Sequence, residues 1–244
     1  MFRRIMLTVL LAGGLAGTVS FGLQTWKLFP LILEAEVYEE SAAAHGHPGM
    51  AHERAVHDGA ALERYAAESE EWTPGNGMER ISYSLLADLL TSIGFAALLV
   101  GAIALSGREV GSREGLLWGL AGFGVFSVAP TLGLPPELPG MMAADLTARQ
   151  IWWVGTAGAS AAAIALVVFA RPSWLKATGG GGLAVLPHAI GAPQALVGGV
   201  VPPELLAHFT IASMAIAAVF WMVLGGLAGT FYQHLNRQPG KHVG

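Results

Sequence analysis

Four histidines lie close together in the most polar segment of the chain. His45, His47, His52 and His57 are interspersed with acidic residues. Neutral imidazole is the commonest side-chain ligand for first-row divalent metal ions, and nearby carboxylates add oxygen ligands and negative potential. The pattern predicts a segment that collects metal ions. The glycines and the proline among the histidines favour flexibility, and the alternative is a solvated loop with incidental histidines.

A second group of polar residues interrupts an apolar stretch. Pro187, His188, Pro193 and Gln194 follow one another within ten residues of apolar sequence. In lipid such residues are costly unless they face a cavity, and a proline frees a backbone carbonyl of its helix. The segment therefore predicts part of a substrate path, with His188 and Gln194 as ligands near the middle of the membrane. The alternative is a proline-kinked structural helix.

Three further residues could bind a cation. Glu204 and His208 are four residues apart at the start of the last apolar stretch, so they share one helix face. Asp88 is the one acidic residue inside an apolar stretch, where an ionisable group is by default a functional candidate. The alternatives are an interfacial ion pair for the first two residues, and for Asp88 a pairing with Arg80, Lys27 or Arg149.

Composition and missing motifs exclude several classes of function. The chain has no cysteine, a net charge of −4 and no basic tract, which argues against thiolate metal sites and nucleic-acid binding. It contains no P-loop sequence and no protease, hydrolase or dinucleotide-binding motif. We expect no enzyme activity and no tightly bound cofactor.

The elements that would hold these residues are membrane-spanning helices. The 244 residues are 53% hydrophobic and 12% charged, whereas soluble domains carry about 25% charged residues. The apolar residues come in blocks that are each long enough to cross a bilayer as a helix. We therefore predict an all-α polytopic membrane helix bundle, a single transmembrane domain over residues 1–244 with about six helices. The blocks are 5–33, 84–105, 115–134, 151–170, 183–201 and 205–232.

Lysine and arginine counts predict the orientation. With the N-terminus inside, eight of these residues fall in the inner segments and four in the outer ones, which favours both termini inside. Residues 34–83 then form a long, acidic, histidine-bearing outer loop. The first block could instead be a cleaved signal peptide with a cut near 17–20, and this alternative stays open. We expect the glycine run 179–182 to be a flexible inner connection.

Several uncommon strings are spread over nearly the whole chain. They occupy 30–36, 72–80 (WTPGNGMER), 118–123, 129–140 (APTLGLPPELPG), 143–146, 149–153 (RQIWW), 186–188 and 191–194. Together they resemble the CbtA family of proposed cobalt transporter subunits. The resemblance implies cobalt transport, a link to cobalamin metabolism, a small histidine-bearing membrane partner of the CbtB type, and a multi-pass place in the prokaryotic cytoplasmic membrane. It implies no ligand set.

These observations favour an importer of a divalent transition-metal cation, with Co²⁺ as the expected ion and Ni²⁺ as an open alternative. The expected partners are the ion, membrane lipid and the small subunit. A different class of function also remains open, in which the chain is a non-conducting scaffold for a metal-binding partner.

Overall fold

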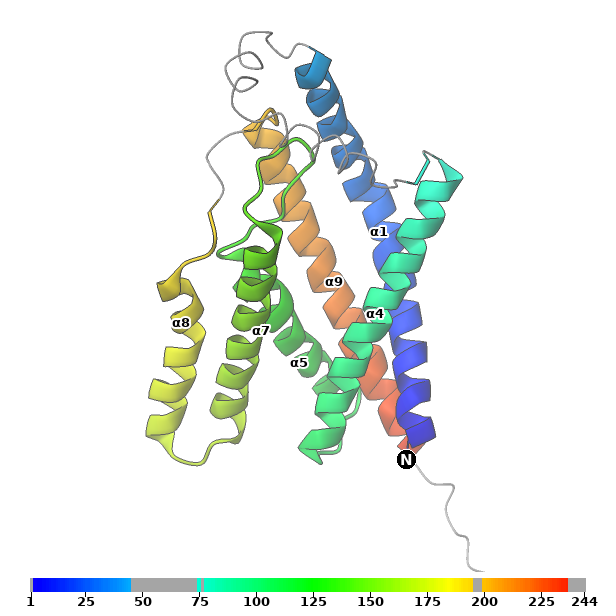
Figure 1. Ribbon diagram of the computed structural model, residues 1–244. Coiled ribbons are helices and arrows are strands. Elements are labelled where there is room, and N and C mark those ends of the chain that lie inside the picture. The colour runs from blue at the N-terminus through cyan, green and yellow to red at the C-terminus, as the bar shows by residue number, and fades with distance from the viewer. Residues whose placement is uncertain (1, 45–73, 76, 195–198, 237–244) are drawn as a thin grey trace, which may run out of the picture.

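The computed structural model describes residues 2–44, 74–75, 77–194 and 199–236, and most of these residues are helical. A helix satisfies every backbone hydrogen bond within one segment, which is what an apolar chain in lipid requires. Figure 1 shows the arrangement. The elements are α1 (Phe2–Ala44), α4 (Met78–Ser106), α5 (Ser112–Phe123), the π-helix η1 (Gly124–Val128), α6 (Ala129–Thr131), α7 (Leu146–Phe169), the π-helix η2 (Leu175–Gly180), α8 (Gly181–Ile190) and α9 (Pro203–Asn236).

Four of these helices are long and apolar enough to cross a membrane. They are α1 over Phe2–Ala42, α4, α7, and α9 over Pro203–Leu235. The prediction of an all-α, multi-pass membrane protein is therefore confirmed. In the described ranges two shorter helical stretches complete the set of six main helices: α5 continues through η1 and α6, and α8 continues from η2.

The core lies where α1, α4 and α9 pack together. Fully buried side chains from these helices form one apolar cluster, which includes Ala12 of α1, Val100 and Ile103 of α4, and Leu224 of α9. Gly13 and Gly17 let α1 approach α4 closely, because a Cβ at Gly13 would lie 2.8 Å from the Ile93 Cα. Small residues allow such close packing in membranes, where the hydrophobic effect does not drive helices together.

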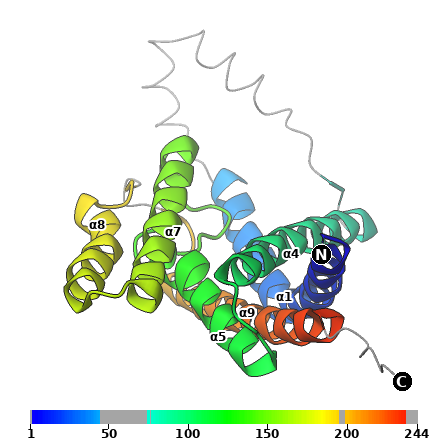
Figure 2. The same ribbon diagram turned by 90° about the horizontal axis from the view of Figure 1, so that it is seen from below.

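The second half of the chain adds a crossing and a hairpin. Helix α5 crosses α9 through glycines, and a Cβ at Gly115 would lie 2.3 Å from the Gly225 carbonyl oxygen. Helix α7 runs beside α8, which packs on α7 at the edge of the molecule, away from α1 and α4 (Figures 1 and 2). The start of α1 and the end of α9 lie at the same end of the bundle (Figure 1).

The structure differs most from the sequence-based boundaries at the ends of the first and fifth helices. Helix α1 continues past the predicted end at residue 33 to Ala44, so the segment between the first two membrane helices begins later than predicted. The fifth helix lies earlier than the predicted block 183–201, because it ends at Ile190, where Gly191 takes a φ of 91° and its N–H bonds to the Pro187 carbonyl.

The expectation of a flexible connection at 179–182 is wrong. Gly179 and Gly180 belong to η2, and Gly181 and Gly182 begin α8. A glycine in a helix loses only about 1 kcal/mol relative to alanine. That loss is smaller than the cost of leaving backbone groups unpaired in an apolar environment, so the helix continues through the glycine run.

Candidate membrane-embedded cation site

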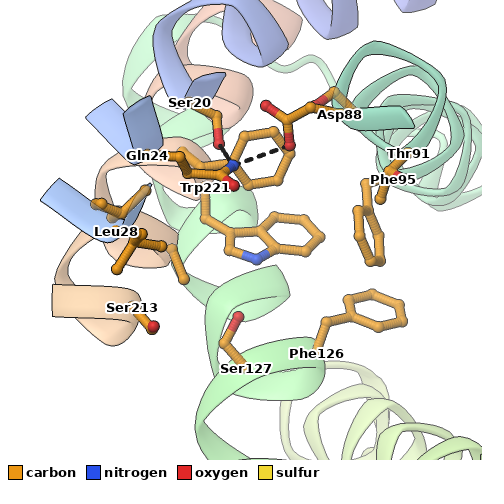
Figure 3. Close-up of a pocket in the computed structure, with 14 residues that line it drawn as sticks. Ser20, Gln24, Leu28, Asp88, Thr91, Phe95, Phe126, Ser127, Ser213 and Trp221 are labelled. Carbon is orange, nitrogen blue, oxygen red and sulfur yellow. Dashed lines mark hydrogen bonds between the residues drawn. The ribbon is translucent and has the colours of Figure 1, made fainter. Parts of the chain in front are cut away.

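A cavity of about 220 Å³ lies between α1, α4, α9 and η1 (Figure 3). Its wall carries a carboxylate, an amide and hydroxyl groups, and the rest of the lining is apolar and aromatic. At about 30 Å³ for each molecule in the liquid, its volume has room for several waters or a partly hydrated ion. The polar lining residues are Ser20, Gln24, Asp88, Thr91, Ser92, Ser127 and Ser213.

Asp88 is the ionisable residue of this cavity, and it is held from α1. The Gln24 Nε2 group donates hydrogen bonds of 2.9 Å to the Asp88 Oδ1 atom and of 2.9 Å to the Ser20 hydroxyl (Figure 3). The other carboxylate oxygen, Oδ2, is buried and has no hydrogen-bond partner. A carboxylate with an unpaired oxygen in the lining of a cavity is a candidate ligand for a cation.

The basic residues that the sequence offered as partners of Asp88 are engaged elsewhere. Arg80 forms an ion pair with Glu36 of α1, with a 3.2 Å bond from Nη1 to Oε2. Arg149 pairs with Glu137 at 2.7 Å. The Lys27 ammonium lies 4.6 Å from the centre of the Trp26 ring. The described contacts therefore show no ion pair between Asp88 and any of these three residues.

An irregular helix completes the cavity wall. In η1 the Ala129 N–H bonds to the Gly124 carbonyl five residues earlier, the pattern of a π-helix. Single π-turns within α-helices are frequent at functional sites. Phe126 and Ser127 of η1 both line the cavity, and the Phe126 ring stacks on the Trp221 indole, with ring centres 5.4 Å apart and planes at 6°.

His188 and Gln194 lie apart from this cavity. His188 is half-buried on α8, and its ring meets the Trp152 indole edge-on, with ring centres 5.9 Å apart. The Trp152 Nε1 group donates a 3.3 Å bond to the Pro187 carbonyl. Gln194 lies beyond the end of α8 and is exposed, so the predicted position inside a membrane helix is wrong for this residue.

Glu204 and His208 occupy the first two turns of α9, and both side chains are exposed. Their neighbours Leu205 and Phe209 are buried in the cluster that includes Leu28 and Ala35 of α1, and the two polar residues share the adjacent, exposed face of α9. In the described part of the chain no ion pair joins Glu204 and His208, so the alternative of an interfacial ion pair is not observed.

The four loop histidines, His45, His47, His52 and His57, lie outside the described residues. Within the described ranges no three His, Asp or Glu side chains come close enough together to hold a metal ion. The structure thus brings Asp88 into a cavity but does not bring it together with His188, Glu204 or His208 as a common ligand set.

Sequence reasoning missed the residues that surround Asp88. Ser20 and Gln24 are separated by four positions in the first apolar stretch, so they share a helix face. This spacing was an available signal, because two polar side chains on one face of an apolar helix indicate a polar partner on a neighbouring helix. Ser92 was available in the same way, since it lies four residues after Asp88 on α4.

One family model matches the chain over residues 2–233, and its description is "Probable cobalt transporter subunit (CbtA)". No curated protein and no solved structure shows significant similarity. The match covers the helices that carry the cavity and the segments in which the sequence strings were found. The chain therefore belongs to the CbtA family, whose members are described as probable cobalt transporter subunits.

Proposed function

We propose that this chain imports a divalent transition-metal cation, with Co²⁺ as its substrate, as one subunit of a transporter in the prokaryotic cytoplasmic membrane. The observation that carries the proposal is the family match over residues 2–233 on a multi-span helix bundle. The cavity at Asp88 supports it, because a half-buried carboxylate inside such a bundle attracts a cation from water.

The proposed topology has six membrane crossings with both termini inside. The main helices alternate in direction along the chain, and the start of α1 and the end of α9 lie at one end (Figure 1). The continuous stretch from Ser112 to Thr131 would be about 30 Å long at 1.5 Å per residue, enough to cross the hydrocarbon layer. The lysine and arginine distribution supports placing both termini inside.

The proposed route begins at the acidic outer segment, where His45, His47, His52 and His57 would raise the local metal concentration. Glu204 and His208 share an exposed face at the outer start of α9 and would present the ion to the bundle. The metal content of purified protein with and without residues 45–57 tests the first step. Equal cobalt content in the two proteins would contradict it.

Asp88 and His188 have separable roles in this proposal. Asp88 supplies the negative charge that the cavity offers to a cation. His188, with Gln194 near the end of α8, would provide a second station on the α7–α8 side of the molecule. Radioactive cobalt uptake by His188→Ala at matched membrane levels tests that station, and normal uptake would remove His188 and Gln194 from the route.

A scaffold role is the second candidate. It is favoured by the absence of a three-ligand metal group among the described residues, since a partner subunit could then supply the imidazoles. The family description as a subunit supports a partner, which we propose to be a small histidine-bearing membrane protein of the CbtB type. Cobalt uptake by this chain in a strain without that partner would exclude the scaffold role, and competition with Ni²⁺ would settle the choice of metal.

A further inference from the structure

We propose that the cavity at Asp88 binds one sodium ion, which drives transport as the coupling ion. The coupling role rests on the proposed function, whereas the sodium site itself rests on the chemistry of the cavity. Three features carry the inference: the donor atoms, the charge of the cavity and the geometry around the free carboxylate oxygen.

The donor atoms of the cavity suit a hard cation. Its polar lining consists of a carboxylate, a side-chain amide and five hydroxyl groups, and it includes neither histidine nor methionine. Carboxylate, carbonyl and water oxygens favour hard cations, while imidazole favours the later transition metals. The transition metal would therefore bind better at the histidines of the chain than in this cavity.

The charge of the cavity suits a monovalent cation. Asp88 is the ionisable residue in its lining, and the neighbouring candidates Arg80, Arg149 and Lys27 make their contacts elsewhere. One sodium ion would neutralise one carboxylate. A divalent ion would leave a net positive charge in a wall of phenylalanine and tryptophan, where an uncompensated charge is strongly unfavourable.

The geometry leaves one carboxylate oxygen for the ion. Gln24 orients the carboxylate by its bond to Oδ1, while the buried Oδ2 atom has no hydrogen-bond partner. In Figure 3 the hydroxyls of Ser127 and Ser213 appear across the cavity from Asp88. A volume of about 220 Å³ gives an ion at the carboxylate room to keep several waters. Sodium sites near the middle of secondary transporters use such oxygen sets where helices are irregular, as η1 is here.

The experiment measures binding of radioactive ²²Na⁺ to the purified full-length protein, with EDTA present so that no divalent metal contributes. We expect saturable binding that K⁺ does not displace, loss of that binding in Asp88→Asn, and unchanged binding in Glu109→Gln. Glu109 is the matched control because it is an exposed carboxylate in the connection between α4 and α5. Sodium should also raise the melting temperature of the wild type and not that of Asp88→Asn, because a ligand of the native state stabilises it.

Several outcomes would overturn the inference. One is an absence of saturable sodium binding by folded wild type, or equal sodium binding by folded Asp88→Asn. Another is displacement of sodium from the site by stoichiometric Co²⁺. A third is a melting temperature that depends on pH but not on sodium, which would mean that Asp88 binds a proton. If Asp88→Asn does not fold, the double variant Ser127→Ala with Ser213→Ala decides: a several-fold weaker affinity for sodium supports the site, and an unchanged affinity contradicts it.

The coupling role has its own measurement. Cobalt uptake that requires an inward sodium gradient supports it, and uptake of equal rate in choline medium overturns it. Sodium binding without any cobalt uptake would leave the ion site in place and would contradict the proposed function instead, so the two failures can be told apart.

Discussion

Gln24 on α1 holds Asp88 on α4 through a 2.9 Å hydrogen bond from its Nε2 group to the Oδ1 atom. The same Nε2 group also donates to Ser20 one turn earlier, so the amide is fixed between two acceptors. The other carboxylate oxygen, Oδ2, is buried and has no hydrogen-bond partner. The relationship gives α1 a direct part in the candidate site, in addition to its part in the core.

Removal of the Gln24 amide should destabilise the protein. In Gln24→Leu the half-buried carboxylate loses its donor, and an unsatisfied buried polar group costs at most about 1–3 kcal/mol. The measurement is the melting temperature in detergent. Asp88→Leu, which removes the acceptor, should reduce the effect of Gln24→Leu when the two changes are combined, because both remove the same hydrogen bond. Additive effects would contradict a direct contact. Thr25→Val, on an exposed position of the same helix, is the control and should change little.

The crossing of α5 and α9 should tolerate no side chain at Gly225. A Cβ there would lie 2.3 Å from the Gly115 carbonyl oxygen, which is part of a helix backbone and has little freedom to move. Overpacking of this kind costs typically about 1–3 kcal/mol. Gly225→Ala should lower the melting temperature and the yield from membranes. At Gly226 the nearest atom would be a Leu116 side-chain carbon at 3.5 Å, so Gly226→Ala should behave as wild type. Equal effects of the two changes would contradict the crossing.

The first helix should be present in the mature protein. Thr8, Ala12 and Ala16 are fully buried, and Ser20 lines the cavity. Cleavage near 17–20 would expose the faces of α4 and α9 that these residues cover. Mass spectrometry of protein isolated from membranes should therefore find peptides that begin before residue 17. A mature N-terminus just after Ser20 would contradict this expectation and favour the signal-peptide alternative.

The sequence predicted what depends on composition and spacing along one helix. Membrane-spanning length marked the helices, and the position of an acid within an apolar stretch marked Asp88. The partner of Asp88 could not be predicted in the same way, because Gln24 is 64 positions away and the rotation of α1 against α4 is set by close contacts such as that of Gly17 with Ser92.

The fifth helix shows a second limit of the sequence pattern. Hydropathy alone treats residues 183–201 as one apolar block, but Gly191 adopts a φ of 91°, a conformation that ends the helix at Ile190. The helix extends in the other direction instead, through a glycine run that would be a natural linker in water. Lipid changes this preference, because a linker there would leave backbone groups unpaired.

Radioactive cobalt uptake by cells that express the chain tests the central claim most directly. Wild type, Asp88→Asn and Glu109→Gln are compared at matched membrane levels, and native folding is checked by monodispersity and melting temperature. We predict uptake above vector controls for wild type and Glu109→Gln, and at least a tenfold loss of rate, about 1.4 kcal/mol or more in activation free energy, for Asp88→Asn. Uptake by folded Asp88→Asn at the wild-type rate would contradict a role for the cavity in metal transport.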